Sequence, residues 1–144
     1  MSTMYSRSFV MLEQSKDALG KVADDDAYLD AACFETQQAV EFLIKAILLE
    51  NGVAYTKSHD IRYLSNLLKD NGFEFDKFDA LELLADTITD WEEESRYGKG
   101  VRTTTQTVQR VHNIYKSMND AFLKTQEQNN ASAAPANDNG TSQN

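Results

Sequence analysis

Cysteine and proline are almost missing from this chain of 144 residues, which holds one of each. The single thiol, Cys33, has no partner for an intrachain disulfide, which excludes a disulfide-stapled secreted fold and fits a reducing cytoplasm. Cys33 falls inside a long apolar segment, where a small core residue is expected. The single proline, Pro135, lies in a polar stretch near the C-terminus.

Positive charge is also scarce, since 14 basic residues face 23 acidic ones and the formal net charge is -9. This balance argues against broad electrostatic binding to nucleic acid, so we expect no DNA partner. The chain has no apolar run of the roughly 20 residues that a membrane span needs. The N-terminus lacks the pattern of a secretory signal, and we expect a soluble, cytoplasmic protein.

Apolar residues recur at helical spacing through most of the chain. The segment from Asp30 to Gly52 has apolar residues on more than one stripe and is expected to be a central, buried helix, capped by Asp30 and ended by Gly52. Four further helices are predicted at 5–22, 61–71, 76–91 and from Thr103 onward, with Thr103 as the cap of the last one. The sequence therefore predicts an all-α bundle of four to five helices.

Two of these helices carry specific expectations. On the first, one face is expected to be buried and carries Tyr5, Phe9, Leu12, Leu19 and Val22. On the last, a buried seam steps by three and four residues and needs a near-parallel neighbour in the same chain or in a second copy. The residues of this seam are Val108, Val111, Tyr115, Met118 and Phe122.

The composition changes near residue 125, after which the chain has no large apolar residue. Such a segment cannot bury enough surface to offset the entropy of ordering. We expect one helical domain over residues 1–124 and a disordered, low-complexity tail over residues 125–144.

Two polar segments are candidates for binding. Lys57 and His59 precede a helix start, which offers free amides to anions, although His59 can equally bond locally beside a cap. The segment 92–102, EEESRYGKGVR, is a second candidate, because arginine grips phosphate and Tyr97 can stack on a base. Its cations can equally pair with the adjacent glutamates; they are Arg96, Lys99 and Arg102.

A third polar place, Arg110 and His112, flanks the seam residue Val111. Side chains two residues apart on a helix point about 200° apart, so these two cannot serve one small site and are expected on the surface. No metal-ligand set, nucleophile motif or dinucleotide fingerprint is found in the sequence. We therefore assign no catalytic residue, metal or cofactor.

The order of these pieces resembles the HEPN family (higher eukaryotes and prokaryotes nucleotide-binding domain) over about residues 5–124. The matching stretches are FETQQAVE at 34–41, KSHDI at 57–61 and ESRY at 94–97. The resemblance implies a compact helical bundle that is commonly dimeric. It also implies either a metal-independent ribonuclease or a nucleotide-binding module that accompanies a minimal nucleotidyltransferase.

The ribonuclease motif in such families is an arginine followed, after four to six residues, by a histidine. Here the nearest arginines before His112 are Arg110 and Arg102, with one and nine residues between, and His59 has no arginine at the required distance before it. We therefore expect a non-catalytic module for a nucleotide, phosphate or RNA ligand, acting as a homodimer with a partner such as a minimal nucleotidyltransferase. The alternative is a toxin- or defence-type ribonuclease, as known in toxin–antitoxin systems, with a rearranged Arg/His site.

Overall fold

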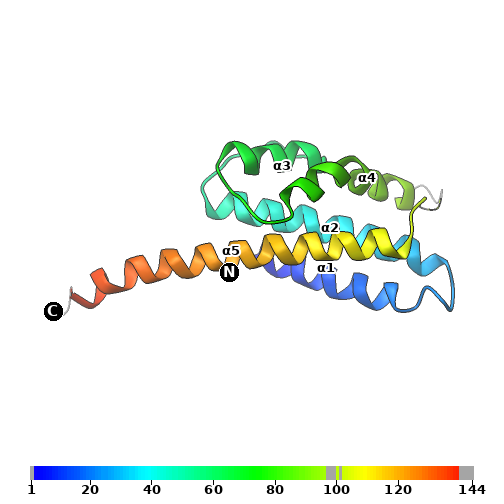
Figure 1. The fold of residues 1–144 in the computed structure, drawn as a ribbon, viewed down its shortest axis with the longest axis horizontal. Coiled ribbons are helices and arrows are strands. Elements are labelled where there is room, and N and C mark those ends of the chain that lie inside the picture. The colour runs from blue at the N-terminus through cyan, green and yellow to red at the C-terminus, as the bar shows by residue number, and fades with distance from the viewer. Residues whose placement is uncertain (1, 97–99, 101, 140–144) are drawn as a thin grey trace.

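The computed structural model describes residues 2–96, 100 and 102–139, with the backbone alone described at residue 96 and at residues 132–139. The described chain contains helices and no strand, which confirms the predicted all-α bundle (Figure 1). The helices are α1 (Thr3–Leu19), α2 (Ala27–Glu50), α3 (Ile61–Asp70), α4 (Phe78–Arg96) and α5 (Thr105–Asn139).

Helix α2 is the centre of the bundle and packs against each of the other four helices. Its buried residues point in several directions, as the apolar residues on more than one stripe predicted. Leu43, Ile44 and Ile47 are fully buried, and so is Cys33. Burial raises the pKa of the Cys33 thiol to about 12, with smaller contributions from Asp30 and Glu94, which marks it as an inert core residue.

The predicted seam of α5 is buried along its whole length, from Val108 to Phe122. Its neighbours belong to the same chain: α5 packs on α2 and α4, and the ring of Phe122 lies 5.7 Å from that of Tyr5 on α1. The seam is thus used inside the domain and does not supply a free dimer face.

The prediction for the inner face of α1 was wrong at Phe9, which is 48% exposed. The buried face instead carries Ser8, Leu12, Ser15 and Ala18. Two serines can be buried because each hydroxyl has partners: Ser8 Oγ donates to the carbonyl of Tyr5 (2.8 Å), and Ser15 Oγ donates to that of Leu12 (2.7 Å). Small hydroxyl residues on this face leave room for polar groups of α5.

Two predicted caps are displaced along the chain. Helix α2 begins at Ala27, so Asp30 lies inside its first turn, while Asp25 Oδ1 accepts a hydrogen bond from the Ala27 amide (2.9 Å). Thr104, and not Thr103, caps α5, with its Oγ1 accepting from the amide of Thr107 (3.2 Å). Helix α4 starts two residues later than expected, at Phe78, and continues beyond Trp91 to Arg96.

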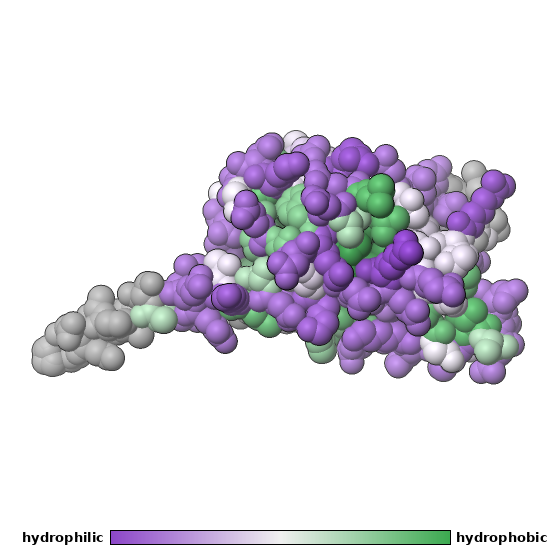
Figure 2. Space-filling model, viewed as in Figure 1, coloured by the Kyte–Doolittle hydropathy of each residue, from purple (hydrophilic) through white to green (hydrophobic). Residues whose placement is uncertain are grey.

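Helix α5 continues to Asn139, into the region predicted as a tail, and extends away from the bundle (Figure 1). Phe122 is the last buried side chain among those described, so the described side chains that follow it on α5 add none to the buried core. The visible face in Figure 2 is mostly hydrophilic, with hydrophobic side chains gathered near α3 and α4. Within the described ranges, none of the helices has the length and hydropathy of a membrane span.

Candidate functional site

The loop between α2 and α3 is held at both ends. Gly52 ends α2 with a φ of 69°, a left-handed conformation that glycine adopts without steric cost. Asp60 caps α3 by accepting from the amides of Arg62 (3.0 Å) and Tyr63 (3.4 Å). The hydroxyl of Ser58 in turn accepts from the Asp60 amide (3.0 Å). These bonds fix the backbone on the C-terminal side of His59 and direct its ring toward α2.

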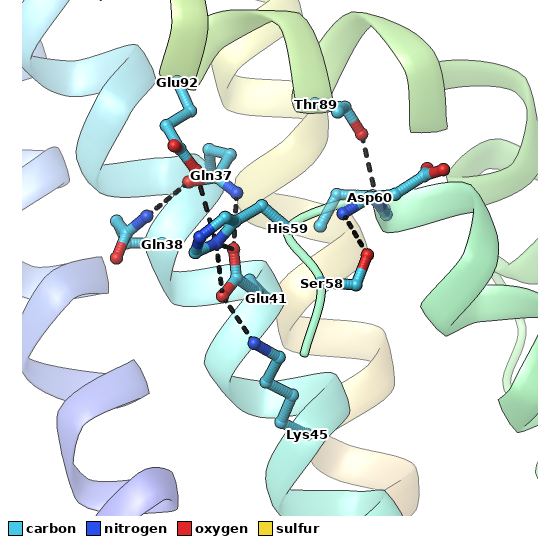
Figure 3. A network of polar contacts seen from close by, with 10 residues as sticks. Gln37, Gln38, Glu41, Lys45, Ser58, His59, Asp60, Thr89 and Glu92 are labelled. Carbon is cyan, nitrogen blue, oxygen red and sulfur yellow. Dashed lines mark hydrogen bonds and ion pairs between the residues drawn. The ribbon is translucent and has the colours of Figure 1, made fainter. Parts of the chain in front are cut away.

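A polar cluster forms where this ring meets α2 and α4 (Figure 3). We call it the Glu41 cluster; its members are Gln37, Glu41, Lys45, His59 and Glu92. His59 Nδ1 lies 3.0 Å from Glu41 Oε1, 3.1 Å from Glu41 Oε2 and 3.5 Å from Glu92 Oε2. Lys45 Nζ donates to Glu41 Oε2 (2.9 Å), and Gln37 Nε2 donates to Glu41 Oε1 (2.8 Å).

Most of this cluster is buried, so its charged groups need compensating partners. The side chain of Glu41 is 1% exposed and those of Lys45 and Glu92 are each 10% exposed. A buried carboxylate is tolerated when cations and hydrogen-bond donors replace the lost water, and Lys45, His59 and Gln37 supply these to Glu41. Residues 37, 41 and 45 step by four along α2, so they share one helix face.

The His59 ring is the exposed side of the cluster, with 54% of its side chain open to solvent. Because Nδ1 faces Glu41 and Glu92, Nε2 is the nitrogen left for solvent or a ligand, and no contact to it occurs in the described part of the chain. An imidazole held in this way can carry a positive charge, offer a single N–H, or ligate a metal.

Lys57, two residues before His59, is exposed and borders an open hollow of about 470 Å³. Lys45 reaches the same hollow, with its Nζ 5.7 Å from the centre of the Tyr55 ring. We call this the Lys57 hollow; it is lined by Met4, Lys45, Leu49, Val53, Ala54, Tyr55 and Lys57. It combines an apolar wall, one aromatic ring and two ammonium groups.

The other predicted binding residues lie around the junction of α4 and α5. Arg96 ends α4, one helical turn after Glu92, and is described by its backbone alone. Arg102 is exposed and lies three residues before the start of α5. Tyr97 and Lys99 are outside the described residues.

His112, expected on the surface, turns into the bundle. Its Nε2 lies 3.0 Å from Ser15 Oγ on α1 and 3.0 Å from Thr36 Oγ1 on α2. Burial, with a smaller effect from Lys16, lowers the pKa of His112 to about 4, so the ring is neutral near pH 7. Arg110 is exposed, as predicted.

Next to His112, another polar pair links α1 to α5. The hydroxyls of Ser8 and Tyr115 lie 2.8 Å apart in the interior, and burial raises the pKa of Tyr115 to about 12. Together with His112, this pair explains why α1 presents serines to the core. We take these contacts as structural ties between helices.

Sequence reasoning placed His59 correctly at a helix entry but did not identify Glu41, Lys45 and Glu92 as its neighbours. Glu41 and Lys45 had a detectable signal: an acidic and a basic residue four apart on a largely apolar helix indicate a buried polar pair. Glu92 had none, because only the packing of α4 on α2 brings it within 3.5 Å of His59.

The fold and site define a small five-helix domain with a buried polar cluster under a loop between its central helix and the next helix. The HEPN domain family matches residues 11–127, and the chain belongs to this family. Neither the curated proteins nor the solved structures compared with the chain gave a significant match.

Proposed function

We propose that this HEPN domain binds a nucleotide or another phosphate-bearing ligand without cleaving it. In this proposal it acts as a homodimer, with a partner protein such as a minimal nucleotidyltransferase. The observation that carries the proposal is the Lys57 hollow and its position beside the Glu41 cluster. Family membership supports it, because the HEPN family is a nucleotide-binding or ribonuclease-type module.

The chemistry of the Lys57 hollow suits a nucleotide. Its volume of about 470 Å³ lies within the roughly 300–1,000 Å³ of small-molecule sites. The ammonium of Lys57 is exposed for a phosphate, while the Tyr55 ring and the side chains of Leu49 and Val53 offer an apolar surface to a base. Positive charge here matters because the chain as a whole carries a net charge of -9.

The Glu41 cluster supports the same surface by holding its groups in place. Lys45 is fixed by Glu41 at 2.9 Å, and the same carboxylate orients His59. A ligand therefore meets side chains that have already lost much of their freedom, which lowers the entropic cost of binding.

Arg96 and Arg102 are the second half of the proposed contact surface, with Tyr97 and Lys99 between them. Arg96 follows Glu92 by one helical turn, so this segment begins close to the place where Glu92 approaches His59. This proximity supports including the segment from Arg96 to Arg102 in the same proposed contact surface.

The ribonuclease alternative pairs His112 with Arg96 or Arg102, and it needs the imidazole of His112 to be accessible. The Nε2 atom of His112 faces the hydroxyls of Ser15 and Thr36, and burial keeps the ring neutral. This environment favours a structural role for His112 and supports a domain that binds without cleaving.

Calorimetric titration with ATP, GTP and a short RNA tests the proposal on the full chain. The informative variants are Lys57→Ala and the double variant Arg96→Ala, Arg102→Ala, with exposed Arg110→Ala as the matched control. Each charge-assisted contact to phosphate contributes about 1.5–3 kcal/mol, so binding should weaken at least about tenfold in the first two and stay unchanged in the control. Absence of heat with every ligand, or equal binding in all variants, overturns the site.

The RNA recovered after titration distinguishes the alternative. Intact RNA is expected from wild type. Cleavage that His112→Ala abolishes, in a variant that remains folded, would identify a ribonuclease. Light scattering over a range of protein concentrations tests the homodimer, since a mass of one chain at all concentrations would contradict it.

A further inference from the structure

We propose that Glu41, His59 and Glu92 form a binding site for a divalent transition metal, with Zn²⁺ as the best match. The three residues come from α2, the α2–α3 loop and α4, and each turns one ligand-type atom toward a common point (Figure 3). The inference goes beyond nucleotide binding and does not depend on it.

The geometry of the donor atoms carries the proposal. One nitrogen and two carboxylate oxygens all lie within 4.8 Å of one another. Zn²⁺ bound about 2.0–2.1 Å from such atoms at tetrahedral angles would hold them about 3.3 Å apart. His59 Nδ1 lies 3.0 Å from Glu41 Oε1 and 3.5 Å from Glu92 Oε2, and both distances are close to that separation.

The surroundings of Glu41 provide the supporting contacts that metal ligands usually have. Gln37 Nε2 donates to Glu41 Oε1 (2.8 Å), and Gln38 Nε2 donates to the side-chain oxygen Oε1 of Gln37 (2.7 Å). These bonds orient the carboxylate before a metal arrives. Two carboxylates converge on the same imidazole ring, so a divalent ion placed there would be held by two anionic ligands.

The donor set also selects the kind of metal. One imidazole with two carboxylates suits Zn²⁺ and related transition metals, whereas Mg²⁺ and Ca²⁺ prefer sites made of oxygen alone. Three protein ligands leave a fourth position for water. The exposed side of His59 gives that position access to solvent.

Metal binding requires a rearrangement of one proton. Without metal, Nδ1 of His59 carries the hydrogen that it donates to Glu41. With metal, the Nδ1 lone pair binds the ion and the ring keeps its proton on Nε2, so a histidinium releases one proton to solvent and a neutral ring changes tautomer.

The experiment uses the full chain with any affinity tag removed and bound metal stripped by a chelator. ZnCl₂, MnCl₂ and MgCl₂ are titrated separately by calorimetry, without nucleotide. We expect one Zn²⁺ per chain, weaker Mn²⁺ binding and the weakest response to Mg²⁺. Replacement by Co²⁺ should produce the visible absorption bands of a low-coordinate site.

Three variants locate the site. His59→Ala and Glu92→Gln should each weaken Zn²⁺ binding at least tenfold, while Glu93→Gln, an exposed neighbour, should leave it unchanged. Circular dichroism checks folding, and because His59 is half exposed its variant is expected to fold. Absence of stoichiometric Zn²⁺ binding, or equal binding in all three variants, overturns the proposal.

Lys45→Met distinguishes a metal site from a purely structural cluster. Removing the ammonium leaves Glu41 without its nearest cation, so the metal-free variant should melt at a lower temperature. Zn²⁺ should then bind more tightly than to wild type and raise the melting temperature further. Failure of Zn²⁺ to stabilise this variant beyond its effect on wild type contradicts the proposal. None of these results depends on nucleotide, so the two proposals fail separately.

Discussion

His59 Nδ1 lies 3.0 Å from Oε1 and 3.1 Å from Oε2 of Glu41, a residue of the central helix that is almost completely buried. This contact links the α2–α3 loop to the core. It also gives a hydrogen-bond donor to the Glu41 carboxylate, whose burial would otherwise destabilise the domain. A ligand that binds His59 therefore contacts a side chain that is hydrogen-bonded to a buried residue of α2.

Glu41→Leu should destabilise the domain strongly. The change leaves the buried ammonium of Lys45 without its partner at 2.9 Å, and breaking a buried ion pair from one side costs about 3–5 kcal/mol. Urea unfolding measures the loss. The double variant Glu41→Leu, Lys45→Met should cost clearly less than the sum of the single changes, and strict additivity would show that the pair is not coupled.

His112 should make the stability of the domain depend on pH. Its pKa is lowered to about 4 in the native state from an ordinary value of 6.5, so the unfolded chain takes up the proton first as the pH falls. The contribution of the neutral ring is complete above pH 6.5 and is lost between about pH 6.5 and 4. The loss amounts to about 2 kcal/mol after allowance for partial exposure of the ring.

Urea unfolding of wild type and His112→Gln at several pH values between 7 and 4 measures this dependence. The variant cannot take up a proton in this range, so its stability should fall less steeply. Equal slopes for the two proteins would contradict the assigned environment of His112.

Asp60→Ala should remove the cap of α3. The Asp60 carboxylate accepts from the amides of Arg62 and Tyr63, and loss of such a cap costs about 1 kcal/mol. Asp60→Asn retains an acceptor and should lose much less. Thermal unfolding compares the two, and an equal loss in both would show that the carboxylate acts through its charge and not as a cap.

Glu35→Gln should stabilise the domain at pH 7. Oε1 of Glu35 is buried without a hydrogen-bond partner among the described residues, and burial, with a smaller effect from Asp17, raises its pKa. A carboxyl group whose pKa is raised in the native state stabilises the domain below about pH 4.5. This contribution is lost as the pH rises through the pKa of the native state.

The uncharged amide avoids that loss, so a gain in stability is expected at pH 7. Urea unfolding at pH 7 measures it against exposed Glu93→Gln, which should show no gain. A destabilised Glu35→Gln variant would indicate that the carboxylate has a favourable interaction in solution.

Much of the fold was predictable because it rests on local patterns. The residues of α5 from Val108 to Phe122 recur at helical spacing, and all members of that seam are buried. Gly52 and Asp60 mark a helix end and a helix start by their own backbone and side-chain chemistry. Phe9 was misplaced because the buried face of α1 is set partly by hydrogen bonds between its serines, Ser8 and Ser15, and polar side chains of α5. These partners cannot be read from the sequence of α1 alone.

The candidate site was predictable only in part, because its contacts also join residues from different elements of the fold. His59 was recognisable as a polar residue at a helix entry, but its partners are distant in the sequence. Glu41 lies 18 positions before it, and Glu92 belongs to α4. Arg96, Lys99 and Arg102 stay a prediction, as does the boundary of the tail at residue 125.

The amino-acid sequence by itself determined the helices, their order and the family, because periodicity, caps and turns act over a few neighbouring residues. Only the tertiary structure decided which polar groups meet. Packing of α4 and the α2–α3 loop against α2 brings Glu41, His59 and Glu92 together, and the low exposure of that place gives their charges strong mutual effects. The same packing turns His112 inward, where loss of water lowers its pKa to about 4.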